Sequence, residues 1–232
     1  IANDFGRIFT SSNQIILLSG VTFQDGDQTI EGDVLSNTLT GGFGNDTLRG
    51  FEASDTLEGN AGDDLLDGGA DADFIDGGDG VDTLTFADDP AGVEANLQTR
   101  LFIDGSGASD SVFNVEALIG SEFDDTLAGS NVFASTIQGL GGGDEITAGD
   151  NGDLLEAGAG DDELTGNLGD DTLLGGLDND LLFGSVGDDV IDGGDGDGDA
   201  ALYDSLANGV DANNRAVTAG GIAPFTVDKR GF

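Results

Sequence analysis

Residues 41–49 read GGFGNDTLR, the clearest copy of a nine-residue unit that recurs along this chain. The unit follows the template G-G-x-G-x-D-x-U-x, in which U is a large apolar residue. Further copies start at Gly50, Gly59, Gly68 and Gly77. Their sixth positions, counted from the unit at Gly41, are Asp46, Asp55, Asp64, Asp73 and Asp82. Their eighth positions are Leu48, Leu57, Leu66, Ile75 and Leu84. The acid and the apolar residue therefore stay in phase throughout this first array.

A second array begins at Gly120, with Asp125 at the sixth position and Leu127 at the eighth. The next unit, 129–138, has an extra residue and no acid, and the array resumes at Gly139. The later sixth positions are Asp144, Asp153, Asp162, Asp171, Asp180 and Asp189. Their apolar partners are Ile146, Leu155, Leu164, Leu173, Leu182 and Ile191. Two weaker units precede the first array, with Gln28 and Asn37 in the acid place and Ile30 and Leu39 in the apolar place. A dozen units in phase exclude chance and linker composition as explanations.

The chemistry of the unit indicates a cation. A glycine-rich turn with one carboxylate, followed by a very short x-U-x strand, is typical of calcium-binding β-solenoid repeats. Glycine permits positive φ and lets the main chain approach an ion closely. Carboxylate and carbonyl oxygens suit a hard cation that accepts irregular geometry, which describes Ca²⁺.

The repeats resemble the RTX family of secreted bacterial proteins, over roughly residues 32–85 and 120–199. The resemblance implies an all-β fold, a right-handed parallel β-roll or β-helix solenoid in which two nonapeptides make one turn. It also implies a secreted, extracellular or cell-surface location in a bacterium. Each Ca²⁺ is expected between loops that lie one turn apart, and we expect roughly ten ions in all.

The resemblance also implies a ligand set for each ion. One loop gives the carbonyls of positions 2 and 4 and its Asp, and the other gives the carbonyls of positions 1 and 3 and its Asp. One such site would use Gly42, Gly44 and Asp46 with Gly59, Ala61 and Asp64. The metal-binding residues implied in the first array are Gly42, Gly44, Asp46, Asp55, Gly59, Ala61, Gly62, Asp64, Gly68, Ala70, Asp73, Gly77, Asp79 and Asp82. Those implied in the second are Asp125, Gly139, Gly141, Gly142, Asp144, Asp153, Ala157, Gly158, Ala159, Gly160, Asp162, Gly166, Leu168, Gly169, Asp171, Gly175, Gly176, Leu177, Asp178, Asp180, Gly184, Val186 and Asp189.

The composition is strongly acidic, with 47 Asp and Glu residues against 6 Lys and Arg and a formal charge of −41. Taken alone, this charge and the 42 glycines predict a disordered chain. The apolar residue two places after nearly every sixth-position acid favours a role as ligands instead. The same charge argues against nucleic acid and anionic membranes as partners, and no apolar run is long enough for membrane insertion.

The sequence lacks the residues on which most catalytic mechanisms depend. The chain has no histidine and no cysteine. This excludes the zinc-peptidase helix motif, Ser-His-Asp triads and disulfides. Paired acids such as Asp63-Asp64 are plentiful, but the second of each pair is a sixth-position residue. We therefore expect no enzyme activity within this chain, and no catalytic or nucleotide-binding residue is predicted.

Five segments are expected along the chain. They are an N-terminal β-helix-like strand segment (1–22), β-roll A (23–85), wider rungs that join the rolls (86–119), β-roll B (120–199) and a C-terminal cap or joining segment (200–232). Strands are predicted over 93–97 and 112–119, and the joining segment is close to two turns long. Asp110 lies outside the repeats and is expected to be nearly silent. The last unit is out of step, with Gly198 at its sixth position, and its site is expected to be altered or absent.

Two functions remain open. The first is a structural or adhesive module of a bacterial surface, matrix or filament protein, which folds on binding Ca²⁺. The alternative is a C-terminal calcium-dependent secretion and folding module of an exported hydrolase or toxin. Ice binding is disfavoured because Leu65 and Phe74 interrupt the outward threonines. Outward positions late in roll B are apolar and need a cover, which is either segment 200–232 or a second copy joined head to tail. These positions are Leu154, Leu174, Leu181, Phe183 and Val190.

Overall fold

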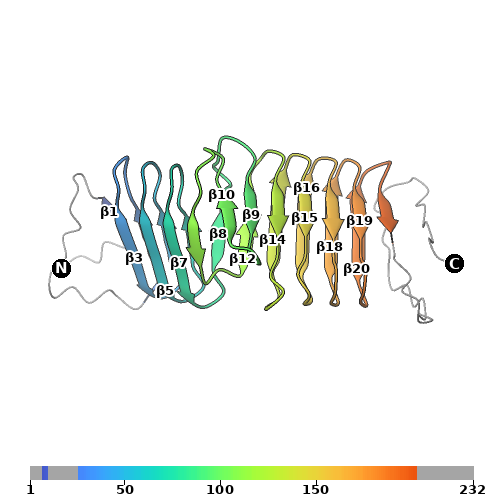
Figure 1. The fold of residues 1–232 in the computed structure, drawn as a ribbon, viewed down its shortest axis with the longest axis horizontal. Coiled ribbons are helices and arrows are strands. Elements are labelled where there is room, and N and C mark those ends of the chain that lie inside the picture. The colour runs from blue at the N-terminus through green and yellow to red at the C-terminus, as the bar shows by residue number, and fades with distance from the viewer. Residues whose placement is uncertain (1–6, 10–25, 203–232) are drawn as a thin grey trace.

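A computed structural model describes residues 7–9 and 26–202 of the chain. Within these ranges every regular element is a β-strand, and no helix occurs that could cross a membrane. The strands stack as successive coils of one elongated solenoid (Figure 1). The all-β parallel solenoid expected from the repeats is therefore confirmed. The apolar stretch at 15–23 and the segment 203–232 lie outside the described residues.

One wall of the solenoid is a single sheet of ten strands that runs along its whole described length. In spatial order its strands are β1 (Arg7–Phe9), β2 (Thr29–Glu31), β4 (Thr47–Arg49), β6 (Leu65–Asp67), β8 (Thr83–Thr85), β12 (Ala117–Ile119), β14 (Thr136–Gly141), β16 (Leu154–Ala159), β18 (Thr172–Leu177) and β20 (Val190–Asp195).

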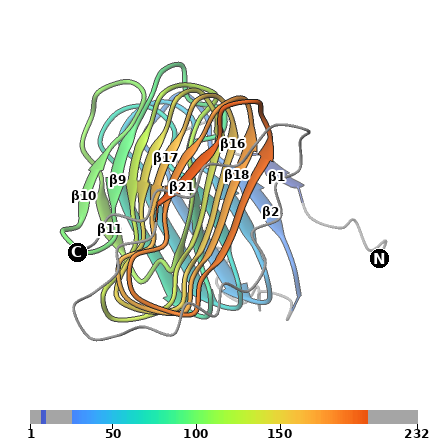
Figure 2. The ribbon, with the colours of Figure 1, turned by 90° about the vertical axis from the view of Figure 1, so that its right-hand side faces the viewer.

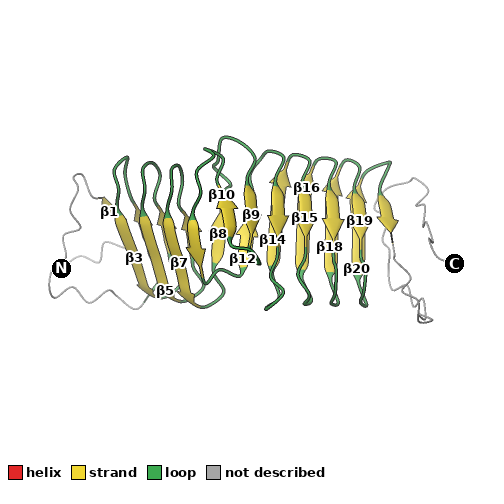
Figure 3. Cartoon of the chain, viewed as in Figure 1, coloured by secondary structure: helices red, strands yellow, loops and turns green. Residues whose placement is uncertain are grey.

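The opposite wall consists of two shorter sheets. The first has four strands, β3 (Thr38–Phe43), β5 (Thr56–Ala61), β7 (Phe74–Asp79) and β11 (Ser111–Phe113). The second has seven, β9 (Glu94–Asn96), β10 (Leu101–Ile103), β13 (Thr126–Ala128), β15 (Glu145–Thr147), β17 (Glu163–Thr165), β19 (Leu181–Phe183) and β21 (Ala200–Leu202). Figure 2 views the coils from the end, and Figure 3 shows that the loops gather at the two edges between the walls.

The strand register follows the doubled repeat. Leu48 pairs with Leu66 and Leu39 with Leu57, so partners lie 18 residues apart in parallel strands. The extra residue in the unit 129–138 lengthens the step, and Leu118 pairs with Ile137. A step of two nonapeptides keeps every eighth residue above its counterpart, because alternate residues of a strand face the same side.

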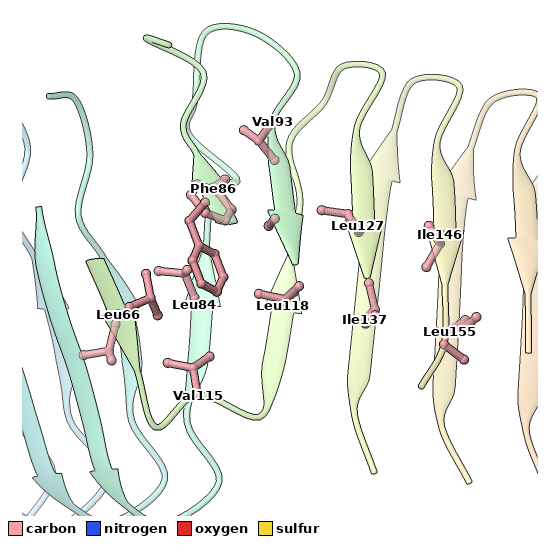
Figure 4. Packing of buried hydrophobic residues seen from close by; sticks show 14 of the residues in the cluster. Leu66, Leu84, Phe86, Val93, Val115, Leu118, Leu127, Ile137, Ile146 and Leu155 are labelled. Atoms are coloured by element: carbon pink, nitrogen blue, oxygen red, sulfur yellow. The ribbon is translucent and has the colours of Figure 1, made fainter. Parts of the chain in front are cut away.

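The core is a file of eighth-position side chains between the two walls. Leu48, Leu66, Ile137 and Leu155 are fully buried, as are most of their counterparts. Figure 4 shows this file in the middle of the solenoid, where Phe86 adds a larger side chain. Complete burial of one such side chain contributes about 1.5–3 kcal/mol. The core is thus built mainly from one large apolar residue per strand.

The segment between the arrays forms one long coil instead of the two rungs expected from its length. Leu84 of β8 pairs directly with Leu118 of β12, so the ten-stranded sheet continues without a break. On the other wall, β11 ends the four-stranded sheet, and the seven-stranded sheet begins with β10 at its edge, followed by β9. The antiparallel strand β10 was not predicted. It follows a tight turn in which Arg100, at φ 59°, donates its N–H to the Asn96 carbonyl over 2.8 Å.

Candidate metal centres

The sixth-position aspartates occupy the inner side of the turns, directly before the strands. All of them except Asp189 are buried almost completely, although each carries a carboxylate. Exposed fractions are 1% for Asp46, 2% for Asp64 and 0% for Asp82. Burial at this level is rare for an aspartate unless its charge is compensated.

Hydrogen bonds join these aspartates into two acid rows, one along each edge of the solenoid. Asp46 donates its main-chain N–H to Oδ1 of Asp64 over 2.7 Å, and Asp64 donates to Oδ1 of Asp82 over 2.8 Å. Asp144 and Asp162 repeat the pattern in the second array at 2.8 Å. The first row is hydrogen-bonded from Gln28 through Asp46, Asp64 and Asp82 to Glu116, and again from Ser135 through Asp153 and Asp171 to Asp189. The second contains Asn37, Asp55, Asp73 and Asp110, followed by Asp125, Asp144, Asp162, Asp180 and Asp199.

The second carboxylate oxygen has no donor in most of these residues. Buried Oδ2 atoms without a hydrogen-bond partner belong to Asp46, Asp55, Asp64, Asp73, Asp82, Asp144, Asp162, Asp171 and Asp180. A buried carboxylate oxygen that accepts nothing loses its hydration without compensation. The rows therefore contain a series of buried oxygens that call for a cation.

Main-chain carbonyls lie next to these orphan oxygens. A Cβ placed on Gly41 would lie 2.5 Å from Oδ2 of Asp46 and 2.6 Å from the carbonyl oxygen of Gly59. A Cβ on Gly139 would likewise meet Oδ2 of Asp144 and the carbonyl oxygen of Ala157. The space beside the first glycine of each unit is thus bordered by a carboxylate and by a carbonyl of the next coil. Both are oxygen donors of the kind that Ca²⁺ prefers.

The fourth-position glycines bring a further carbonyl close to the following coil. Gly62, at φ 131°, lies against the carbonyl oxygen of Gly44, and Gly160, at φ 140°, lies against that of Gly142. A side chain at either glycine would be strained and would overlap that oxygen. The residues present therefore fit a series of hard cations held by carboxylates and carbonyls. Within 26–202 no group of three acidic side chains could hold an ion alone, so the main chain must complete each site.

The ionisation of the rows reflects their burial. Desolvation raises the pKa of Asp144, Asp171 and Asp180 to about 7, and repulsion from neighbouring row carboxylates adds to the effect. The main-chain hydrogen bonds to Oδ1 lower the pKa, but by less than burial raises it. A bound divalent cation would reverse this balance, because it favours the ionised form of each ligand.

The nine-residue spacing did not identify three members of the rows. Asp73 donates its N–H to Oδ1 of Asp110 over 2.9 Å, and Asp82 donates to Oε2 of Glu116 over 3.0 Å. At the far end Asp180 donates to Oδ1 of Asp199 over 3.1 Å. Asp110 lies outside the nonapeptide repeats but continues the hydrogen-bonded row, so a change there should not be silent. The alteration expected around Gly198 takes the form of a one-residue shift of the acid.

A simpler signal would have found these residues. Every row member stands two positions before an inward side chain, as Asp110 does before Val112 and Glu116 before Leu118. The offset to the inward residue survives where the repeat length changes, because it is set within one turn and strand.

Two predicted ligands differ from the rest. Asp125 accepts from the N–H of Ser121 at Oδ2 and from the N–H of Val93 at Oδ1. Asp153 accepts from the N–H of Gly149 at Oδ2, over 2.8 Å. Both oxygens of these residues thus have protein donors, which leaves less acceptor capacity for an ion. The predicted carbonyl donors Leu168, Leu177 and Val186 expose their side chains at the loops, so only their main chain could face a metal.

Comparisons with known proteins agree with the repeat pattern. A family described as RTX calcium-binding nonapeptide repeat (4 copies) matches residues 24–50, 31–62, 49–84, 133–164 and 165–199. Among solved structures, the extracellular lipase LipA from Serratia marcescens matches at 16% identity with a TM-score of 0.25. That match covers 81% of this chain but only 34% of the lipase chain. No curated protein sequence matches the chain.

Proposed function

The chain belongs to the RTX calcium-binding nonapeptide repeat family, and from this premise we propose that it is a secreted structural module of a bacterial surface, matrix or filament protein. In this proposal the module folds when calcium enters its turns. The two rows of buried carboxylates, most of whose Oδ2 atoms lack donors, carry the argument. Within 26–202 the two basic side chains do not compensate them, because Arg49 pairs with Asp67 and Asp88, and Arg100 lies over the Phe113 ring.

Each ion would sit between loops one coil apart. The Asp46 and Asp64 carboxylates would bind it together with carbonyl oxygens that include those of Gly44 and Gly59. Binding would neutralise two carboxylates at once and join adjacent coils. Roughly ten such ions would cancel about half of the formal charge of the chain.

The location of the protein follows from the same linkage. A chain that needs calcium to neutralise its core edges stays unfolded where calcium is scarce, and folds where it is abundant. Extracellular calcium modules commonly bind with dissociation constants of about 10⁻⁴ to 10⁻³ M. Export in the unfolded state, followed by folding outside the cell, fits a chain of this kind.

Self-association is part of the proposed structural role. Phe183 of β19 and Leu202 of β21 are paired neighbours at the last described coil, and both are only half-buried. Val190 of β20 is 46% exposed on the opposite wall. A solenoid end presents open strand edges as well as these apolar groups, and both favour contact with another copy.

Calcium removal tests the folding proposal directly. Circular dichroism of the chain in EGTA should show mostly coil, and millimolar calcium should restore the β-sheet signal. Magnesium at the same concentration serves as the control and should restore less, because Mg²⁺ dehydrates reluctantly and demands octahedral geometry. A chain that is fully folded in EGTA at neutral pH would overturn the proposal.

A further inference from the structure

A β-hairpin in the long coil buries an aspartate that belongs to no repeat. β10 continues into a turn over 104–108, in which Asp104 donates its N–H to the Ala108 carbonyl over 3.1 Å. One step further out, Asp110 donates its N–H to the Phe102 carbonyl over 3.0 Å. Phe102, Asp104 and Asp110 therefore alternate onto one side of the hairpin, and all three are buried, with Asp104 only 2% exposed.

The two oxygens of the Asp104 carboxylate have different roles. Oδ1 closes the turn, because it accepts from the N–H of Ser106 at 2.9 Å, from Ser106 Oγ at 2.7 Å and from the N–H of Ala108 at 2.8 Å. Oδ2 is buried and has no partner. Within 26–202 neither Arg49, which pairs with Asp67 and Asp88, nor Arg100, which lies over the Phe113 ring, forms an ion pair with Asp104. The turn accounts for one oxygen and leaves the other unexplained.

Other acceptor groups surround this part of the hairpin. Because Ile103 pairs with Ser109, Asp104 and Asp110 are diagonal neighbours on the same side of the hairpin, close enough for one ion to lie between their carboxylates. The charge of Asp104 is among the influences that raise the pKa of Asp110, after burial itself. Asp89 accepts from the N–H of Gly105 at 2.7 Å, and a Cβ on Gly105 would lie 2.5 Å from the carbonyl oxygen of Ala91. The donors of the turn are thus all used by other oxygens, and Oδ2 of Asp104 is left without one.

We propose that Asp104 and Asp110 hold an additional calcium ion, outside the nonapeptide register, with main-chain oxygens and water completing its coordination. Asp110 would be shared with the acid row through Asp73, and Asp104 would be a ligand that no repeat supplies. Two carboxylates per ion match the sites proposed in the rolls. The inference rests on the proposed calcium-dependent folding and adds one site to it.

The test counts bound ions in the full-length chain by equilibrium dialysis against radioactive calcium. Asp104→Asn keeps an oxygen that can close the turn and removes the charge, so it should bind one ion fewer than the unmodified chain. Asp71→Asn is the matched control, because the Asp71 side chain is exposed on a neighbouring loop and only its main-chain N–H contacts the turn, by donating to Ser106 Oγ over 3.4 Å. An unchanged ion count and calcium midpoint in Asp104→Asn would overturn the proposal.

Two further variants separate the possible failures. Ser106→Ala weakens the turn without touching the charge and should retain the full ion count, so a loss there would mean that Asp104 acts only through the turn. Asp64→Asn probes a repeat site. Loss of ions in Asp64→Asn but not in Asp104→Asn would reject the hairpin site alone, whereas full binding in both would reject the ligands proposed for the repeats. Asp104→Asn could fail to regain the β-sheet signal in saturating calcium. In that case the bound ions are counted in Asp110→Asn instead. An ion count for Asp110→Asn equal to that of Asp71→Asn would overturn the proposal.

Discussion

Asp73 donates its main-chain N–H to Oδ1 of Asp110 over 2.9 Å, although the two residues are 37 positions apart in the sequence. Asp55 makes the equivalent bond to Asp73 at 2.7 Å, over a separation of 18 positions. The acid row therefore passes from the repeats into the long coil without a missing member. Carboxylates thus continue along the edge of the solenoid where the nine-residue repeat is interrupted.

Replacing Asp110 by alanine should cost as much as replacing Asp64. Each substitution removes a buried acceptor for a neighbour's N–H, worth about 1.5–3 kcal/mol when the acceptor is charged, and also a proposed ligand. Both should shift the folding midpoint to higher calcium in a circular dichroism titration. Asp71→Ala, at an exposed loop position, should shift it far less. An Asp110→Ala midpoint equal to that of the unmodified chain would show that the row ends at Asp73.

Gly41→Ala should interfere with one calcium site through space alone. The new methyl group would lie 2.5 Å from Oδ2 of Asp46 and 2.6 Å from the carbonyl oxygen of Gly59, in the space assigned to an ion or next to it. Gly26→Ala is the control, because a Cβ there meets nothing within 4 Å. Calorimetric titration should find fewer bound ions in Gly41→Ala and the full number in Gly26→Ala. Equal numbers would place the ions elsewhere.

Acid should partly replace calcium in the metal-free chain. The pKa values of Asp73, Asp144, Asp171 and Asp180 rise to about 7 in the folded state, mainly through burial. The pKa of an aspartate in an unfolded chain is about 3.9. Because the folded-state pKa is higher, protonation of these groups stabilises the fold at low pH, and this stabilisation is lost as the pH rises through about 7. In EGTA, the β-sheet signal should therefore increase from pH 8 to pH 5.

The calcium-loaded chain should show the opposite trend, because protons compete with the ion for the same oxygens. Parallel titrations followed by circular dichroism in EGTA and in calcium provide the comparison. Identical pH profiles in the two conditions would mean that the row carboxylates are not the groups that bind calcium.

Phe183→Ser should weaken self-association if the last coil is a contact surface. The substitution removes a half-exposed aromatic ring beside Leu202 and leaves the inward file intact. Phe43→Ser is a suitable control, since Phe43 is 67% exposed in the first array, far from that end. Sedimentation velocity in calcium should show smaller species only for Phe183→Ser. Should both variants sediment like the unmodified chain, this surface has no part in assembly.

The inward file and most of both rows could be predicted from the sequence, because a fixed phase places each acid two residues before an apolar side chain. Leu66 and Asp64 illustrate this coupling. The hairpin around β10 could not be predicted in this way. Its direction depends on a turn in which Arg100 adopts positive φ, and on the burial of Phe102, and neither has a periodic signature. Asp104 was missed for the same reason, since its environment exists only after the hairpin has formed.

The bonds within each row all point the same way, from the N–H of one coil to the carboxylate of the next. The solenoid consequently has a polarity, and its two ends are chemically different. At the C-terminal end Asp189 and Asp199 accept such bonds, and no described coil follows to receive their own N–H groups. A further coil at this end would supply a carboxylate acceptor for these N–H groups and would at the same time complete a cation-binding site. Folding can thus spread from one coil to the next, because each coil that forms supplies hydrogen-bond partners and metal ligands to its neighbour.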